Sequence, residues 1–524
     1  MSRPASLLLD LEPLRRDRDF RLIWVGQVVS SIGRQVTVVT LPYQLWVATG
    51  SPLSIGALSM VQLVPLVAFS LYGGAIADAV DRRRLLLLTQ SILALSSASL
   101  AVLAAVPHIP IVLVYVVAFL AATVSAVDQP ARTSAVPRLV PRERLTMAIA
   151  LNQAGFQTAG VVGPAIGGLL IATVGPAGAY LVDAVTYGAS LAALVVIAPI
   201  PALKGVVRPG LAAVGEGLRF ARSRAEILAT FVVDLDAMIF GMPQALFPIL
   251  ALTVFHVGAQ GYGLLAAAPA AGALVGALLT GWVSRVHFQG RAVYIAVALW
   301  GIAITAFGLA TFSLPLALLL LAIAGAADVI SAVFRATILQ LATPDELRGR
   351  LSALHGMVVT AGPRLGDMEA TVVAAAVNAQ FSVVSGGLAC LVGLGLIAWR
   401  LPQFGRYEAV RVPGIVPGSP GGAPGSAGIV PRSPGGAPGS AGIVPGTTGI
   451  VPRSPGGAGS AGIVPGSAGI VPGTTGNVPG TTGIVPRSPG GAGSSPRPPS
   501  PGVPGAARPA GAPFPSDAVP DVEP

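Results

Sequence analysis

The sequence predicts an all-α polytopic membrane protein with twelve spanning helices in two halves of six, followed by an unfolded tail. Hydrophobic residues make up 53% of the 524 residues and charged residues only 10%, whereas a soluble domain carries about 25% charged residues. Apolar stretches of about 20 residues, the length needed to cross a bilayer, recur along the first 400 residues. Beyond them Pro, Gly and Ser dominate. This pattern excludes a soluble globular protein and a coiled coil.

The apolar stretches predict twelve spans, which group into two sets of six. Their expected bounds are 22–48, 53–77, 85–106, 111–131, 146–174, 177–199, 228–253, 261–284, 292–312, 315–336, 352–377 and 381–399. The chain then divides into an N-terminal segment (1–21), a first half (22–199), a central loop (200–227), a second half (228–400) and a tail (401–524).

The breaks between spans alternate between two kinds. Arg-rich breaks precede the first span and follow every second one, for example Arg82 to Arg84 and Arg132 to Arg144. The intervening breaks contain neither Lys nor Arg, for example Pro107 to Pro110. Because Lys and Arg remain on the cytoplasmic side, the pattern predicts a multi-pass inner-membrane protein with both termini in the cytoplasm and no cleaved signal peptide.

The net charge of +10 does not indicate nucleic-acid binding, because the basic residues lie at the ends of apolar stretches rather than in one patch. Cys390 is the single cysteine, so no intrachain disulfide is possible. The four His are scattered, and metal sites need clustered ligands. We expect no metal and no cofactor.

An internal repeat supports the division into halves. Gly163-Pro-Ala-Ile-Gly167 in span five recurs as Gly362-Pro363-Arg364-Leu-Gly366 in span eleven. Pro141-Arg-Glu-Arg-Leu and Pro344-Asp-Glu-Leu lie just upstream of the two copies. Repeats of this kind are typical of secondary transporters.

The tail repeats Gly-Ile-Val-Pro and Arg-Ser-Pro-Gly-Gly-Ala units. Such a composition offers too little apolar surface to form a core. We expect residues 401–524 to form a disordered cytoplasmic extension with no function of its own.

The break after span two contains a charged motif with glycine at its start. The string reads Gly74-Ala-Ile-Ala-Asp78-Ala-Val-Asp-Arg82-Arg83. It resembles the signature of the major facilitator superfamily between spans two and three, although Ala79 and Asp81 depart from it. The resemblance implies that Gly74, Asp78, Arg82 and Arg83 latch one conformation of the transporter. The alternative is a helix cap beside arginines at the lipid headgroups.

Span five contains a second motif, formed by Gly163, Pro164, Gly167 and Gly168. It resembles the antiporter signature of drug exporters, with Ala159 in place of the leading Gly, and this resemblance favours export over import. Ordinary close packing through small residues is the alternative.

Three further strings narrow the resemblance: Asp128-Gln-Pro-Ala-Arg132 after span four, Gly241-Met-Pro243 in span seven, and Arg335 to Arg350 after span ten. Together they resemble the enterobactin-exporter-like, transmembrane secretion effector branch of the superfamily over about residues 14–400. The resemblance implies a monomeric major facilitator fold and drug/proton-antiporter-like export. Span four lacks the Arg-x-x-x-Gly motif of many proton antiporters.

Ionisable side chains within the spans cost on the order of 3 kcal/mol each and are candidates for transport or proton coupling. The candidates are Arg34, Asp183, Asp234, Asp236, Asp328, Arg364, Asp367 and Glu369. Arg34 has no acid within its own span, so it needs a partner from another helix, a lipid headgroup or an anionic substrate. We favour Arg34 with Asp234 or Asp328, because the resemblance implies that spans one, four, seven and ten line the cavity.

Several of these charges also have structural interpretations. Arg364 and Asp367 lie on one helix face and are expected to form an internal ion pair. Asp234 and Asp236 point about 200° apart, so one of them should bond a neighbouring helix. Asp183 is expected near the outer surface, and Arg335 is expected to extend to the lipid headgroups.

The predicted function is export of a small amphipathic molecule, such as a siderophore or drug, driven by the proton gradient across the lipid bilayer. Two alternatives remain: an importer or uniporter of the same fold, and a non-transporting scaffold whose tail binds partners. An enzyme is the least supported class, because the breaks contain no nucleophile–base or metal constellation.

Overall fold

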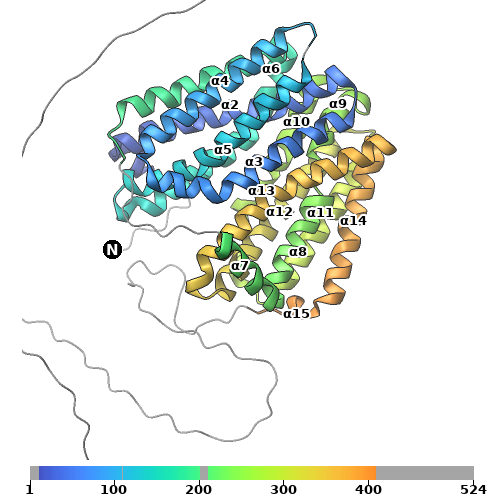
Figure 1. Cartoon of the computed structure of the whole chain (residues 1–524). Helices are drawn as coiled ribbons and strands as arrows, with labels where there is room; N and C mark the ends of the chain where they lie inside the picture. The colour runs from blue at the N-terminus through green and yellow to red at the C-terminus, as the bar shows by residue number, and fades with distance from the viewer. Residues whose placement is uncertain (1–10, 109, 201–210, 409–524) are drawn as a thin grey trace, which may run out of the picture. The chain divides into compact units, whose positions relative to one another are not determined.

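The computed structural model describes residues 11–108, 110–200 and 211–408, without the side chains of 70–79, 211–214, 284 and 285. Figure 1 shows the described part as a bundle of long helices. The first helices are α1 (Glu12–Arg16), α2 (Arg18–Thr49), α3 (Pro52–Ala79), α4 (Arg82–Ala105), α5 (Ile111–Leu139), η1 (Arg142–Arg144) and α6 (Leu145–Val196). They form the first half, which is followed by α7 (Leu211–Ser223).

The second half contains the remaining helices. These are α8 (Ala225–Phe240), η2 (Gln244–Leu246), α9 (Phe247–Thr253), α10 (Gly258–Leu278), η3 (Thr280–Arg285), α11 (Gln289–Leu309), α12 (Leu314–Ala342), α13 (Asp345–Ala376), α14 (Ala379–Arg400) and α15 (Pro402–Gly405).

The described residues contain 10 helical segments that are long and apolar enough to cross a membrane. One of them, α6, is two spans, because Gly175 breaks it with φ 73° and ψ 177°. The long helix α13 adds another, although Arg364, Asp367 and Glu369 make it less apolar. The described chain therefore has the twelve spans that the sequence predicts.

Helix ends explain where spans stop. Gly50 ends α2 in the left-handed conformation at φ 62°, which glycine adopts without strain. The Asp81 side chain caps α4 by accepting a hydrogen bond from the Arg84 backbone at 3.0 Å. Asn378 caps α14 in the same way.

Span seven is not continuous. The helix α8 ends at Phe240, and the chain resumes helical structure at Gln244. Pro243 between them has no backbone N–H to continue the helical ladder. The break exposes the Gly241 carbonyl, which accepts a hydrogen bond from the Trp300 indole on α11 at 2.7 Å.

Several helices extend beyond the predicted spans. Spans were expected to end at 131 and 336, but α5 continues to Leu139 and α12 to Ala342. Asp128 to Arg132 therefore lie within a helix and not in a break. The second half also extends past residue 400, where α15 buries Phe404 against Tyr294 of α11. The rest of the predicted tail lies outside the described residues.

The glycines of the internal repeat make the same contact in each half. Gly163 and Gly167 of α6 face Gln35, Val36 and Val39 of α2, so closely that a side chain would overlap them. Gly362 and Gly366 of α13 face Met238 and Ile239 of α8 in the same manner. The repeat found in the sequence therefore marks equivalent helix pairs in the two halves.

We call the helix ends next to residues 50–51, 106–110, 175, 254–257, 310–313 and 377–378 the arginine-poor end, and the opposite ends the arginine-rich end. The two halves meet through α3 against α13 and α6 against α10 (Figure 1). Close contacts join them in the arginine-poor part of these helices. A Cβ on Gly168 of α6 would lie 2.7 Å from the Gly263 Cα of α10.

Candidate functional site

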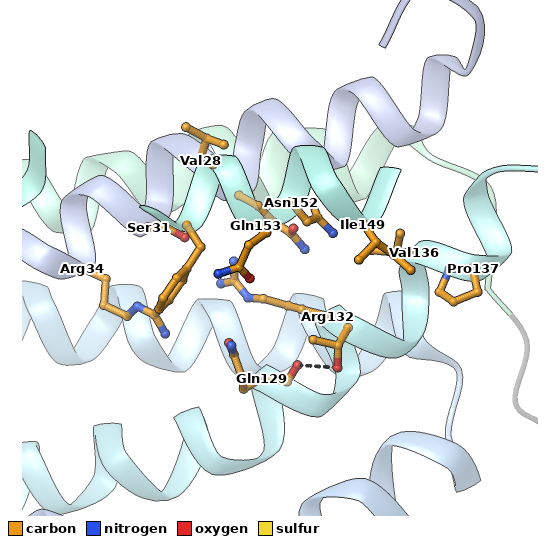
Figure 2. A pocket seen from close by; sticks show the side chains of 14 residues that line it. Val28, Ser31, Arg34, Gln129, Arg132, Val136, Pro137, Ile149, Asn152 and Gln153 are labelled. Carbon is orange, nitrogen blue, oxygen red and sulfur yellow. Dashed lines mark hydrogen bonds between the residues drawn. The ribbon is translucent and has the colours of Figure 1, made fainter. Parts of the chain in front are cut away.

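A pocket of about 430 Å³ lies in the first half, between α2, α5 and the first part of α6. Figure 2 shows it with Arg34 at one end and Pro137 at the other. Pro137 belongs to the last turn of α5, at the arginine-rich end, whereas Arg34 lies near the middle of α2. At 1.5 Å per residue, Arg34 is about 24 Å along the axis from the start of α2. The pocket therefore extends from the arginine-rich end toward the middle of the span.

The pocket lining combines amides, hydroxyls and apolar side chains with two arginines. The lining residues are Gln27, Val28, Ser31, Arg34, Gln129, Arg132, Thr133, Val136, Pro137, Ile149, Asn152, Gln153, Gly155 and Phe156. Figure 2 shows Arg132 of α5 and Gln153 of α6 extending toward the same part of the pocket. A lining of this kind suits a molecule with both apolar and polar parts.

The two arginines of the pocket differ in their partners. Arg132 forms an ion pair with Asp128, and Asp128 also accepts a hydrogen bond from Thr89 at 2.7 Å. Among the described residues, Arg34 has no hydrogen-bond partner and no carboxylate within 4.0 Å. Asp183 acts on it electrostatically from a greater distance. Arg34 therefore brings to the pocket a positive charge that has no direct ion-pair partner.

A second group of charges lies inside the second half. Asp234 on α8 is 1% exposed, and its Oδ1 lies 2.8 Å from Nη2 of Arg335 on α12. The Nη1 of Arg335 donates to Ser331 at 2.7 Å. Asp328, which lies on α12 two helical turns before Arg335, has its Oδ1 3.7 Å from the same Nη2. A buried ion pair thus joins spans seven and ten.

Two partly exposed groups flank this buried pair. The side chain of Asp328 is 31% exposed, and that of His355 on α13 is 34% exposed. The His355 Nδ1 lies 4.0 Å from Asp234 Oδ2. We call Asp234, Asp328, Arg335 and His355 the charge cluster. It contains one buried carboxylate with titratable groups on both sides of it.

The charge cluster bears on two expectations. The sequence favoured Arg34 with Asp234 or Asp328 as coupling candidates; the structure pairs both acids with Arg335 and places Arg34 at the pocket of the first half. Arg335 was expected to reach the lipid headgroups, yet it is 3% exposed. The physical reason is that Asp234 on the adjacent helix α8 provides a buried anionic partner. Arg335 therefore does not need to extend to the headgroups to find one.

Asp183 is buried within the first half, with 1% of its surface exposed. Its Oδ2 accepts hydrogen bonds at 2.6 Å from Thr37 on α2 and from Ser97 on α4. It is not among the residues that line the pocket. These bonds tie three helices of the first half together.

Asp236 bonds a neighbouring helix, as the angle between it and Asp234 predicted. Its carboxylate hydrogen-bonds with the Cys390 thiol on α14. A Cβ on Gly393 of the same helix would overlap the Asp236 carboxylate. Asp236 therefore packs against span twelve, on the side of α8 away from Arg335.

The predicted Arg364–Asp367 ion pair is present, with Arg364 Nη1 3.6 Å from Asp367 Oδ2. The same oxygen accepts a hydrogen bond at 2.8 Å from Ser59 on α3, in the other half. Asp367 Oδ1 accepts the Ala245 backbone N–H at 3.2 Å, next to the break in span seven. Asp367 thus links the two halves in addition to pairing within its helix.

The motif after span two is described only in part. Of Gly74 and Asp78 the structure describes only the backbone, which belongs to α3. Arg82 is 1% exposed and donates from Nε to Ser134 of α5 at 2.9 Å, so its side chain is held inside the first half. Arg83 donates to the carbonyls of Leu194 and Val195, at the end of α6. A cation there complements the negative end of the helix dipole.

Each glycine of the span-five motif serves one of two interfaces. Gly163 and Gly167 pack α6 against α2 within the first half, whereas Gly168 packs it against α10 of the second half. Pro164 contributes a carbonyl to the same contact, since a Cβ on Gly263 would lie 2.7 Å from it. The motif therefore sits at a junction between the halves as well as within one.

The pocket amides and His355 were not predicted from the sequence. Asn and Gln within apolar spans could have been singled out as costly to bury, and Gln27, Gln129, Asn152 and Gln153 would then have been found. His355 was set aside because the four His are far apart in sequence. The described residues contain no cluster of His, Cys, Asp or Glu that could hold a metal ion.

The sequence pattern of the transmembrane secretion effector family matches residues 9–412. The chain belongs to this family of the major facilitator superfamily. A multidrug efflux pump, Tap, of Mycolicibacterium fortuitum is 30% identical over 403 residues, covering 75% of this chain and 98% of the relative. The enterobactin exporter EntS of Citrobacter koseri is 27% identical over 400 residues, covering 74% and 95%.

Solved structures share the fold. A bacterial homologue of the human lysosomal transporter Spinster, solved in an inward-facing and unoccupied conformation, superposes with a TM-score of 0.59 at 16% identity, covering 75% of this chain and 97% of the other. A POT family transporter in complex with 5-aminolevulinic acid superposes with a TM-score of 0.60 at 12% identity, covering 74% of this chain and 97% of the other. The fold of this family member is thus that of major facilitator transporters, and the two relatives named above are an efflux pump and an exporter.

Proposed function

We propose that the protein exports a small amphipathic molecule from the cytoplasm in exchange for protons. The observation that carries the proposal is the charge cluster, in which the buried Asp234–Arg335 pair lies between the partly exposed Asp328 and His355. A buried carboxylate with a switchable partner can hold a proton in one conformation and release it in another. The relatives named as exporters support the direction of transport.

Alternating access is the mechanism that the arrangement of the halves supports. The halves touch in the arginine-poor part through Ser59–Asp367 and Gly168–Gly263, and the pocket extends to the arginine-rich end. If the arginine-rich end faces the cytoplasm, this state is open inward and ready to receive a cytoplasmic substrate. Rocking of one half against the other would then expose the pocket to the outside.

The proposed orientation predicts on which side of the membrane the end of the second half and the break at Gly50 lie. A fluorescent reporter that folds only in the cytoplasm should be bright when fused after Gly405. An alkaline phosphatase, which is active only outside the cytoplasm, should be active when inserted after Gly50, at the arginine-poor end. Active phosphatase after Gly405 would invert the orientation and with it the direction of transport.

Efflux from whole cells tests the function. Cells that express the protein are loaded with a panel of fluorescent dyes and antibiotics, and efflux is followed with and without a protonophore. We expect efflux above the vector control that stops when the protonophore collapses the gradient. Efflux that persists would refute proton coupling. Accumulation above the vector control would favour an importer or uniporter, and a phenotype that needs only residues 409–524 would favour a scaffold.

A further inference from the structure

We propose that the pocket of the first half binds the anionic group of the exported molecule, with Arg34 as its partner. This inference rests on the proposed function and adds the chemical class of the substrate. It starts from the charge balance of the pocket. Arg132 is compensated by Asp128, whereas Arg34 has no carboxylate within 4.0 Å among the described residues. None of the residues that line the pocket is acidic.

A second observation points to the same chemistry. The Gln27 Nε2 is buried at the pocket wall and has no hydrogen-bond partner. A buried donor left without a partner costs about 1–3 kcal/mol, and a cation without an ion-pair partner in a membrane span costs more. Gln27 and Arg34 lie seven residues, about 10 Å, apart along α2, so an anionic group would satisfy Arg34 and a second acceptor of the same occupant would satisfy Gln27. A guanidinium and an amide N–H are donors that a carboxylate, sulfonate or phosphate accepts.

The rest of the pocket indicates what the anion is attached to. Val28, Val136, Ile149 and Phe156 provide apolar wall beside the amides. The space of about 430 Å³ falls in the range of pockets that bind small organic molecules. The occupant is therefore an amphipathic organic anion. An anionic phospholipid has the same headgroup chemistry, but the proposal assigns the pocket to the exported solute.

Dye binding to the purified protein in neutral detergent tests the inference. Fluorescein, an anionic xanthene dye, and rhodamine 6G, a cationic one, are titrated and followed by anisotropy. We expect saturable fluorescein binding that weakens about tenfold in Arg34→Gln, or about 1.4 kcal/mol. Arg34→Lys keeps the charge and should retain most of the affinity. Arg16→Gln, an exposed arginine paired with Glu12, is the matched control and should bind as the unchanged protein does.

The outcomes separate this inference from the proposed function. Arg34-dependent fluorescein binding supports the inference even if whole cells show no efflux, in which case the proposed function alone fails. Equal binding to Arg34→Gln and the unchanged protein, or no saturable fluorescein binding, overturns the inference even if rhodamine 6G is exported. Displacement of fluorescein by small amounts of phosphatidylglycerol, but not of phosphatidylcholine, would assign the pocket to a lipid headgroup and overturn it as well.

Discussion

Asp234→Asn is expected to abolish protonophore-sensitive efflux while leaving the protein in the membrane. The substitution removes the only buried carboxylate of the charge cluster and leaves Arg335 without its partner at 2.8 Å. Asn cannot take up and release a proton, so the coupling step is lost even if the substrate still binds. The measurement is dye efflux at matched protein levels, together with fluorescein binding, which should be unchanged because the pocket lies in the other half.

Asp236→Asn is the matched control for this experiment. Asp236 lies on the same helix and is also buried, but it bonds Cys390 on α14 rather than Arg335. We expect this variant to keep efflux. Equal loss in both variants would indicate damage to α8 rather than loss of coupling, and full efflux by Asp234→Asn would remove Asp234 from the mechanism.

Loss of the buried Asp234–Arg335 pair can also destabilise the protein, since breaking a buried ion pair costs about 3–5 kcal/mol. The double variant Asp234→Asn, Arg335→Gln removes both charges and should recover much of the thermal stability that the single variant loses. It should not recover efflux. Recovery of efflux in the double variant would show that the pair serves stability alone.

The second large effect is expected for Gly168→Val. A Cβ at this position would lie 2.6 Å from the Ala259 carbonyl oxygen and 2.7 Å from the Gly263 Cα. These atoms are backbone, so no side-chain rotation relieves the overlap, and the halves must separate at this end. Overpacking costs about 1–3 kcal/mol, which shifts a two-state equilibrium by roughly 5- to 150-fold.

The shift can be measured as chemical access. A cysteine introduced at Ser59 on a Cys390→Ala background reacts slowly with a water-soluble maleimide if the arginine-poor end is closed. In Gly168→Val this reaction should be faster, and efflux should fall. Gly188→Ala is the control, because no atom lies within 4 Å of a Cβ at that position. Unchanged access in Gly168→Val would contradict the role of this contact.

The architecture could be predicted because it depends on local properties of the chain. Twenty apolar residues are long enough to span a bilayer wherever they occur. Gly163 and Gly362 could be matched as a repeat because both copies keep the same short string. The break at Gly175 was also expected, since Gly and Pro interrupt a helix whatever surrounds them. Each of these features can be judged from a few neighbouring residues.

The partners of the charged residues within the spans could be predicted only in part. Their presence was evident from the sequence, and the pairing of Arg364 with Asp367 could be predicted because both lie on one helix face. The partners of Asp183 and Asp367 in the structure include Ser97 and Ser59, which lie 86 and 308 residues away along the chain. No spacing rule links such residues.

By itself, the sequence determined that this chain crosses the membrane repeatedly in two related halves, and which of its buried residues carry charge. Only the tertiary structure decided that Asp234 pairs with Arg335 and that Arg34 is left without a partner in a polar pocket. The reason is that the partner of a side chain within the membrane depends on how each helix is rotated about its axis and which helix packs beside it. Both are set by packing over the whole bundle.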